Sequence, residues 1–530
     1  MRGLLWLLPP VAVLVAFFGY PLALVLHQSF LTDDGAFGLA NWQGVLASPE
    51  FRHALVRTAL LALAATAGCL VLGVFLALVI AFAPFPGVRA VSRLVDVVLA
   101  FPSFLIALAF TFLYGSAGVL NAALGGGSVD FLYSPWGVLL AEITFYTPFV
   151  MRPALAAFSQ VPGAQLDVAA SLGASPWRVL RRVVLPDALP ALASGACLTL
   201  LLCMNEFGIV LFVGAKDVVT LPMLVYTKAI VTFDYPAACV VAVVNVAFSG
   251  VLYALHRKVF AKGRAVLLWT RRSRAVAIAL FAVLFAVVVV APLAMIALAS
   301  VAGSWNGVLP SDLTGEHLAE AVRGEAVAGA LVSAQTAVIA ALAAVVLGTW
   351  LALGSARAPR AVRRVLDAAA HLPLAVPSVV VGLGLLVAFS RPPLPLNGTR
   401  WIVLVAHLVI LLPFTFSVVS AAQRRADPLP AAVAASLGAA PPRVLWRVRV
   451  PVLLPAMSAS ASLGLALSMG EVGATIMLYP PDWRTLPVSV FALTDRGQVF
   501  AASASTVLLL GITLAGLVAL GAVRPRAAER

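Results

Sequence analysis

Charge is scarce in this sequence. Only 11% of the 530 residues are Asp, Glu, Lys or Arg, and 62% are hydrophobic, whereas a soluble globular chain carries about 25% charged residues. Apolar runs of about 20 residues, long enough to cross a bilayer as helices, recur from Leu4 to the region of Gly521. This composition argues against a soluble enzyme, a disordered scaffold or a nucleic-acid-binding domain, and it predicts a polytopic membrane protein.

The sequence also lacks the groups that a catalytic or ATP-binding site needs. It contains no G-x-x-x-x-G-K-[ST] motif and no Gly-Lys dipeptide, so no loop is predicted to bind ATP phosphates. No Ser-His-Asp set, paired catalytic carboxylates or metal cluster emerges. The four cysteines lie in or beside apolar stretches without metal-ligand spacing, as buried apolar residues do. We therefore predict no enzyme activity, no catalytic residue, no metal and no cofactor in this chain.

Hydrophobic periodicity and run length predict an all-α protein with about twelve membrane spans. Prolines inside some runs do not exclude a span, because neighbouring groups can satisfy the freed backbone. The predicted spans are 4–26, 55–83, 93–114, 136–158, 189–213, 236–256, 275–299, 328–356, 370–390, 401–422, 453–477 and 499–523.

The distribution of charge predicts the orientation of these spans. The net charge is +14, and the segment 257–274 carries seven Lys and Arg residues and no acidic residue. Because basic loops stay in the cytoplasm, we predict that this linker and both termini are cytoplasmic. The protein itself is predicted to lie in the cell membrane, or in the inner membrane of a cell that has two membranes. The excess Lys and Arg residues are then expected to contact the lipid bilayer rather than nucleic acid.

The chain contains two copies of one six-span unit. Ala170-Ser171-Leu172-Gly173-Ala174 recurs as Ala435-Ser436-Leu437-Gly438-Ala439, an offset of 265 residues (438 minus 173) that the two tryptophans Trp136 and Trp401 also share. We predict a first repeat at 1–256, a cytoplasmic linker at 257–274 and a second repeat at 275–530. An even number of spans makes the repeats parallel, and such a pair encloses a central path.

Two long cytoplasmic loops share one pattern. Each reads as a short helix rich in small residues, a glycine and a second basic helix ending in proline, with 13 residues from Gly173 to Pro186 and from Gly438 to Pro451. A helix of small residues can enter a groove on another protein while basic and aromatic side chains anchor it. The alternative is an amphipathic helix on anionic lipid, which leaves the duplicated pattern unexplained.

These loops resemble the signature of permease subunits of type I ATP-binding-cassette importers: E-A-A, three residues, Gly, nine residues, Ile, one residue, Leu-Pro. The resemblance implies that both loops are coupling helices for two copies of a cytoplasmic ATPase, which binds ATP and magnesium, and that an extracytoplasmic solute-binding protein delivers the solute. The acidic position of the motif is Asp167 in one loop and Ala432 in the other. The residues carried over are Asp167, Ala169, Gly173, Arg178, Pro186, Ala434, Gly438, Arg443 and Pro451.

The resemblance extends over most of the chain. Segments 131–160 and 205–230 look like one permease of the 2-aminoethylphosphonate importer, and segments 304–310, 377–390, 397–409 and 469–497 are similar to its second permease. The implied function is a fused importer permease with 2-aminoethylphosphonate as its small-molecule substrate. Importers of ferric iron, thiamine or polyamines share much of the pattern. A proton-coupled secondary transporter and a membrane scaffold are the alternatives from other classes.

Four polar residues in or near the spans are candidates for the solute path: Glu142, Glu206, His407 and Glu471. Glu206 follows Pro186 by 20 residues, about 30 Å along a helix, so we expect it and Glu471 at the outer mouth, either meeting the solute or as solvated helix-end carboxylates. Glu142 and His407 share the 265 offset and lie deeper. They either line the path or form a hydrogen bond, with each other or with backbone.

Overall fold

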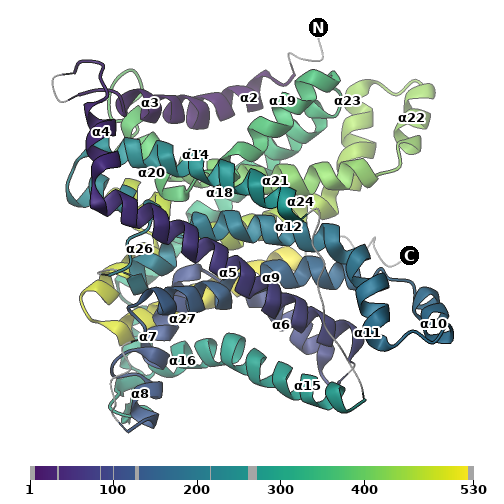
Figure 1. Cartoon of the computed structure of the whole chain (residues 1–530). Coiled ribbons are helices and arrows are strands. Elements are labelled where there is room, and N and C mark those ends of the chain that lie inside the picture. The colour runs from purple at the N-terminus through teal and green to yellow at the C-terminus, as the bar shows by residue number, and fades with distance from the viewer. Residues whose placement is uncertain are drawn as a thin grey trace. The chain divides into compact units, whose positions relative to one another are not determined.

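The protein is predominantly helical. The computed structural model describes residues 6–32, 35–83, 85–98, 101–125, 131–214, 217–260 and 271–522, and Figure 1 shows helices along most of this length. Among these residues the single named sheet has two short antiparallel strands, β1 (Ala302–Ser304) and β2 (Asp312–Leu313). The prediction of an all-α fold is confirmed.

The chain folds into two compact units that do not follow the order of the sequence. Unit 1 contains Met1–Gly38, Ala319–Arg496 and Ser505–Arg530, and unit 2 contains Leu39–Leu318 and Gly497–Ala504. The beginning of each repeat therefore belongs to the unit that is otherwise built from the other repeat. Local hydrophobic periodicity carries no signal for such an exchange, because it reports which face of a helix is buried and not the partner that buries it.

The elements of unit 2 are α4 (Ala40–Ala47), α5 (Pro49–Phe82), α6 (Val88–Val98), α7 (Ser103–Tyr114), α8 (Val119–Ala123), α9 (Pro135–Phe158), α10 (Gly163–Ser171), α11 (Pro176–Val179), η2 (Leu180–Val184), α12 (Leu185–Met204), η3 (Val210–Gly214), α13 (Leu221–Tyr226), η4 (Thr227–Val231), α14 (Tyr235–Phe260), α15 (Arg271–Phe285), η5 (Ala286–Val290) and α16 (Ala291–Ala299).

The elements of unit 1 are α2 (Leu8–Leu14), η1 (Val15–Gly19), α3 (Tyr20–Gln28), α18 (Glu325–Ser355), α19 (Arg360–His371), η6 (Leu372–Ala375), α20 (Ser378–Ala388), α21 (Arg400–Arg425), α22 (Leu429–Ser436), α23 (Pro441–Val444), η7 (Leu445–Arg449), α24 (Val450–Met469), α25 (Gly473–Leu478) and α26 (Leu486–Asp495). Helices α17 (Glu316–Ala321) and α27 (Val499–Ala522) cross the boundaries between units.

The core of each unit is a close helix pair that a glycine makes possible. A Cβ on Gly73 of α5 would lie 3.1–3.2 Å from the Thr147 carbonyl oxygen, Val150 and Met151 of α9, and one on Gly348 of α18 would lie 2.8–3.2 Å from Thr415 and Phe416 of α21. Small residues at such crossings let helix backbones approach closely. The same crossing therefore forms in both repeats.

The first helical segment of each repeat packs against helices of the other repeat, in agreement with the division into units. In unit 1, Phe17 lies against Phe389, with ring centroids 5.6 Å apart, and α3 packs on α20. In unit 2, Phe281 of α15 lies 5.3 Å from Phe85, and α16 packs on α7. These contacts tie the two repeats together within each unit.

Ten helices of the described residues are long and apolar enough to cross a membrane, and a pair bent by 103°, Arg360–Ala375 with Ser378–Ala388, would make eleven. Predicted span 136–158 coincides with α9, which is not among these eleven. The total of twelve therefore stays a prediction. Pro373 and Pro377 stand at the bend inside predicted span 370–390, because proline removes a backbone donor and restricts the residue before it.

Two other predicted spans end earlier than expected. Spans 189–213 and 453–477 are each interrupted, since α12 ends at Met204 and α24 ends at Met469. Each break is followed by a glutamate, Glu206 or Glu471, whose side chain accepts a hydrogen bond from the backbone N–H three residues further on. The glutamates therefore begin a new helical segment instead of continuing the old one.

Candidate coupling elements, buried polar clusters and a crevice

Each predicted coupling loop is a helical hairpin with the same internal geometry. Gly173, after α10, and Gly438, after α22, have φ of +74° and +82°. The N–H of Ala174 donates to the Ala169 carbonyl, and the N–H of Ala439 donates to the Ala434 carbonyl, both at 3.0 Å. A left-handed glycine followed by this bond is a Schellman cap, which ends a helix and redirects the chain. Figure 1 shows α10 with α11 and α22 with α23 as hairpins.

The hairpins present apolar side chains outward. Leu172 and Leu437, each just before the glycine, are 81% and 82% exposed, and none of the residues of α22 is buried. A Cβ on either glycine would meet nothing within 4 Å. A duplicated apolar tip left in solvent is typical of a surface that another protein covers.

The residues predicted for coupling lie on or beside these hairpins. Two of the small residues, Ala169 and Ala434, are half-buried against their own hairpin. The exposed ones are Asp167, Gly173, Arg178, Pro186, Gly438, Arg443 and Pro451. The structure thus gives the two loops equivalent shapes, and the difference between Asp167 and Ala432 lies on an exposed surface in both.

Glu206 is buried in unit 2, with 5% of its surface exposed. Its Oε1 accepts hydrogen bonds from Ser103 Oγ at 3.1 Å and from the Ile209 N–H at 2.7 Å, and Oε2 accepts one from the hydroxyl of Tyr146. The alternative of a solvated helix-end carboxylate is therefore wrong for Glu206, because three donors from three segments enclose it.

The repeat mate Glu471 makes the same capping contact in unit 1. Its Oε1 accepts a hydrogen bond from the Ala474 N–H at 2.9 Å, and its surface is only half-buried. Three residues separate acceptor and donor in both repeats. The break after α12 and α24 is therefore a shared feature of the fold.

His407 is 1% exposed in unit 1. Its Nδ1 lies 2.6 Å from Ser468 Oγ, and its Nε2 lies 2.9 Å from Thr475 Oγ1. Both ring nitrogens therefore have partners inside unit 1, and a Glu142–His407 hydrogen bond stays a prediction. Glu142, in unit 2, is also 1% exposed, and its Oε2 has no hydrogen-bond partner among the residues that the structure describes.

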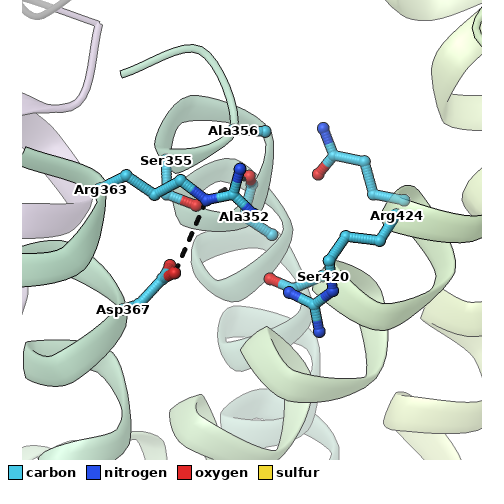
Figure 2. Close-up of a pocket in the computed structure, with 8 residues that line it drawn as sticks. Ala352, Ser355, Ala356, Arg363, Asp367, Ser420 and Arg424 are labelled. Atoms are coloured by element: carbon cyan, nitrogen blue, oxygen red, sulfur yellow. Dashed lines mark hydrogen bonds and ion pairs between the residues drawn. The ribbon is translucent and has the colours of Figure 1, made fainter. Parts of the chain in front are cut away.

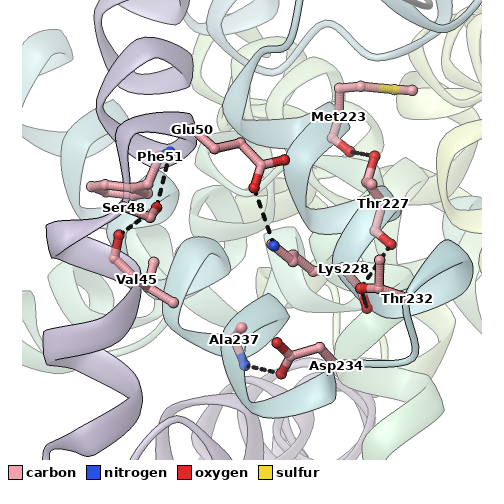
Figure 3. A network of polar contacts seen from close by, with 10 residues as sticks. All are labelled: Val45, Ser48, Glu50, Phe51, Met223, Thr227, Lys228, Thr232, Asp234 and Ala237. Carbon is pink, nitrogen blue, oxygen red and sulfur yellow. Dashed lines mark hydrogen bonds and ion pairs between the residues drawn. The ribbon is translucent and has the colours of Figure 1, made fainter.

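A polar network that sequence reasoning missed orders the segment between η4 and α14 (Figure 3). Lys228 Nζ forms an ion pair with Glu50 Oε2 at 3.1 Å, and Asp234 caps α14 by accepting from the Ala237 N–H at 3.1 Å. Between them Phe233 is 68% exposed, with φ of +55°. Bulky residues rarely adopt a positive φ. The contacts of Lys228 and Asp234 on either side therefore hold Phe233 in this conformation, with its ring exposed.

A crevice at the ends of α18, α19 and α21 was also missed (Figure 2). Its volume is about 210 Å³, and it is lined by Ala352, Ser355, Ala356, Arg363, Asp367, Ser420, Gln423 and Arg424. Arg363 and Asp367 form an ion pair at 3.7 Å. Nearby, Arg357 lies over the Trp6 ring at 5.5 Å, and burial together with Arg449 lowers its pKa. The signal in the sequence, scattered polar residues at helix ends, was too diffuse to identify this crevice.

The comparison with protein families decides the identity. The sequence model of the binding-protein-dependent transport system inner membrane component matches residues 69–261 and 344–528. The chain belongs to this family. It carries the transport component twice, as expected for two permease subunits joined in one chain, and such a component is a multi-pass membrane subunit that is not itself catalytic.

Similar proteins are named as permeases of a 2-aminoethylphosphonate transport system. PhnU of Salmonella paratyphi A is 51% identical over 263 residues, which are 48% of this chain and 91% of PhnU. PhnV of the same organism is 43% identical over 265 residues, which are 50% of this chain and 100% of PhnV. A crystal structure of a bacterial alginate ABC transporter with an alginate-bound periplasmic protein covers 48% of this chain and 94% of the solved chain, at 21% identity and a TM-score of 0.42.

Proposed function

We propose that this transport component is the fused permease of an ATP-driven importer for 2-aminoethylphosphonate. One observation carries the substrate assignment: two differently named permeases of a single transport system each align with about half of this chain. A permease pair from one system shares one solute. Fusion then fixes the two halves at a ratio of one to one.

The hairpins α10–α11 and α22–α23 are the proposed contacts for two copies of a cytoplasmic ATPase. The support is their duplicated shape, their exposed Leu172 and Leu437, and the basic residues Arg178 and Arg443 beside them. This proposal puts both hairpins, the linker 257–274 and both termini on the cytoplasmic side of the cell membrane, in agreement with the basic loops. ATP and magnesium are bound by the partner.

The opposite end of unit 2 is the proposed contact for an extracytoplasmic solute-binding protein. Helix α5 begins there, at Pro49, and α14 begins there, at Tyr235, and the Glu50–Lys228 ion pair holds the intervening Phe233 outward. An exposed aromatic side chain on a rigid segment is suited to anchor a protein contact. The family description, binding-protein-dependent transport, supports a partner of this kind.

In this proposal the chain has two conformations, and its partners shift the equilibrium between them. ATP binding on the ATPases moves the hairpins, and the moving hairpins carry α9, α12, α21 and α24, to which they are joined. The solute then enters from its binding protein, and hydrolysis resets the cycle. A ligand can shift such an equilibrium only by its difference in affinity for the two states.

Of the four candidates for the solute path, Glu142 is the one we propose to keep. Glu206, Glu471 and His407 are used as helix caps or in local hydrogen bonds. Glu142 is buried with Oε2 unpaired among the described residues. A buried carboxylate oxygen without a partner is costly, and a solute ammonium group would satisfy it.

Uptake of radiolabelled 2-aminoethylphosphonate tests the function. The chain would be co-expressed with its ATPase and binding protein in cells that lack other uptake routes, with and without the ATPase and with a protonophore. Uptake should require the ATPase, survive collapse of the proton gradient, and resist excess thiamine, putrescine or ferric citrate. Inhibition by one of these solutes would indicate the related importer, and uptake without the ATPase would indicate a proton-coupled secondary transporter.

A further inference from the structure

Polar and charged side chains make up most of the lining of the crevice in Figure 2. Its volume of about 210 Å³ is below the roughly 300–1,000 Å³ of pockets for drug-sized ligands. Side chains of Arg363, Ser420, Gln423 and Arg424 supply guanidinium, hydroxyl and amide donors from two different helices. Convergence of several donors on one small space suits a compact ligand rich in acceptors.

In the other repeat, two of the corresponding positions carry apolar side chains. At the offset of 265, Ser420 corresponds to Leu155 and Gln423 corresponds to Phe158. Phe158 is buried, at 2% exposed, and its ring centroid lies 5.9 Å from that of Phe82. The same helix end can therefore close by hydrophobic packing, and the second repeat carries polar residues instead.

One of those polar residues is buried without a partner. Ser420 is 7% exposed, and its Oγ makes no hydrogen bond to the part of the chain that the structure describes. A buried hydroxyl without a hydrogen-bond partner destabilises the folded protein. Because the hydroxyl lines the crevice, an acceptor atom of a bound ligand would remove this cost.

The charges that line the crevice favour an anion. The lining contains two guanidinium groups, of Arg363 and Arg424, and one carboxylate, of Asp367, which is paired to Nε of Arg363. Arg357 and Arg449 add positive charge at the same end of unit 1. Arginine forms its strongest hydrogen bonds with phosphate and carboxylate oxygens, and a tetrahedral group with three oxygens can accept from several donors at once.

We propose that this crevice binds a phosphate-type oxyanion, the group shared by free phosphate, phosphonates and phospholipid headgroups. The site is specific to the second repeat. Arg424 precedes the first residue of α22, Leu429, by five residues on a continuous chain, so an anion that links α18, α19 and α21 would restrain the base of one coupling hairpin. The proposal does not depend on which solute is transported.

Binding of inorganic phosphate to the purified full-length protein in phosphatidylcholine nanodiscs is the first test, measured by isothermal titration calorimetry. Sodium chloride at equal ionic strength is the control for screening. We expect saturable binding of one phosphate per chain. A second preparation, in nanodiscs containing phosphatidylglycerol, is analysed by native mass spectrometry for retained lipid, which distinguishes a headgroup from a free anion.

Three variants make the test specific to this crevice. Arg424→Met removes an exposed guanidinium and should weaken phosphate binding about tenfold, as expected for one charged hydrogen-bonding group. Ser420→Leu with Gln423→Phe installs the residues of the first repeat and should abolish binding by filling the space. Arg425→Met is the matched control, because Arg425 is the next residue of α21, is exposed, and is not part of the lining.

The results of these measurements distinguish a free-anion site, a headgroup site and the absence of a site. Phosphate binding that falls in Arg424→Met and not in Arg425→Met supports a site for a free anion. Absence of phosphate binding, together with phosphatidylglycerol that is retained by the wild type and by Arg425→Met and lost in Arg424→Met and in the filled variant, supports a headgroup site. If neither ligand distinguishes the wild type from Arg424→Met, or if Arg425→Met loses binding equally, the proposal is overturned. Because Arg424 and Arg425 are both exposed, we expect both variants to fold.

Discussion

The indole nitrogen of Trp350 donates a hydrogen bond of 2.8 Å to the backbone carbonyl of Trp6, 344 positions earlier in the chain. The two rings also lie 5.7 Å apart. This contact joins the start of the first repeat to a long helix of the second within unit 1. A single chain thereby gains an interlock between its two permease halves, since the beginning of one half is part of the core of the other.

The interlock predicts a rescue between distant residues. A Cβ at Gly354 would collide with the side chain of Leu7, so Gly354→Val should destabilise the protein by about 1–3 kcal/mol through overpacking. Leu7→Ala should recover part of this loss, with a coupling of about 1 kcal/mol or more. Thermal unfolding of the purified protein in detergent measures both. Gly511→Val is the control, because a Cβ there meets open space, and additive effects of the first pair would contradict the interlock.

Glu206 is predicted to act through stability rather than solute recognition. Glu206→Ala leaves the donors of Ser103, Tyr146 and Ile209 without their acceptor and should lower the free energy of unfolding by about 2 kcal/mol or more. Glu471→Ala should cost less, because that side chain is only half-buried. Thermal unfolding compares the two. Equal melting temperatures for the wild type and Glu206→Ala would show that the cluster is not structural.

Glutamine substitutions separate a path role from a structural one. Glu206→Gln keeps a carbonyl oxygen as acceptor, so uptake should stay within about threefold of the wild type. Glu142→Gln should lower 2-aminoethylphosphonate uptake at least tenfold, about 1.4 kcal/mol, with little change in melting temperature, because a neutral amide attracts an ammonium group less than a carboxylate does. Uptake assays on both variants decide, and unchanged uptake in Glu142→Gln would remove it from the proposed path.

The hairpin tips predict a loss of coupling without a loss of fold. Leu172→Asp with Leu437→Asp places two carboxylates on side chains that are 81% and 82% exposed, so the melting temperature should not fall. Burying those charges in an ATPase groove is costly, and solute-stimulated ATP hydrolysis should drop at least tenfold. Gly173→Asp with Gly438→Asp should act similarly, although both glycines have positive φ, so their melting temperatures require a check. Full stimulation in the leucine variant would argue against docking at these tips.

Phe233 is predicted to contribute to the contact with the solute-binding protein. Phe233→Asn suits the positive φ of this position and removes the exposed aromatic ring, so the melting temperature should hold or rise. The affinity for the binding protein, measured by surface plasmon resonance, should fall about tenfold or more. Val251→Asn, an exposed apolar position on α14, is the control. Equal affinities for the wild type and Phe233→Asn would exclude this segment from the contact.

Patterns within short stretches of sequence were sufficient to predict the helical membrane fold, the repeat and the two hairpins. Each of these features depends on residues that are close together in the chain or on a direct comparison of two stretches. The length of an apolar run predicts a span, a glycine that can adopt a left-handed φ predicts a helix end, and the offset of 265 residues reveals the repeat. The equal capping contacts of Glu206 and Glu471 are a further consequence of that repeat, although reasoning from helix length alone extended the spans through them.

The same patterns did not predict which segments bury these helices. Several features depend on residues far apart in the chain. They are the exchange of first helices, the Ser103 and Tyr146 donors to Glu206, the contacts of His407 with Ser468 and Thr475, and the crevice beside Ser420. An apolar stripe on a helix predicts that this face is buried, but it does not identify the segment that packs against it. Polar side chains in a membrane protein take the donors and acceptors that packing brings within reach, and packing is a property of the whole fold.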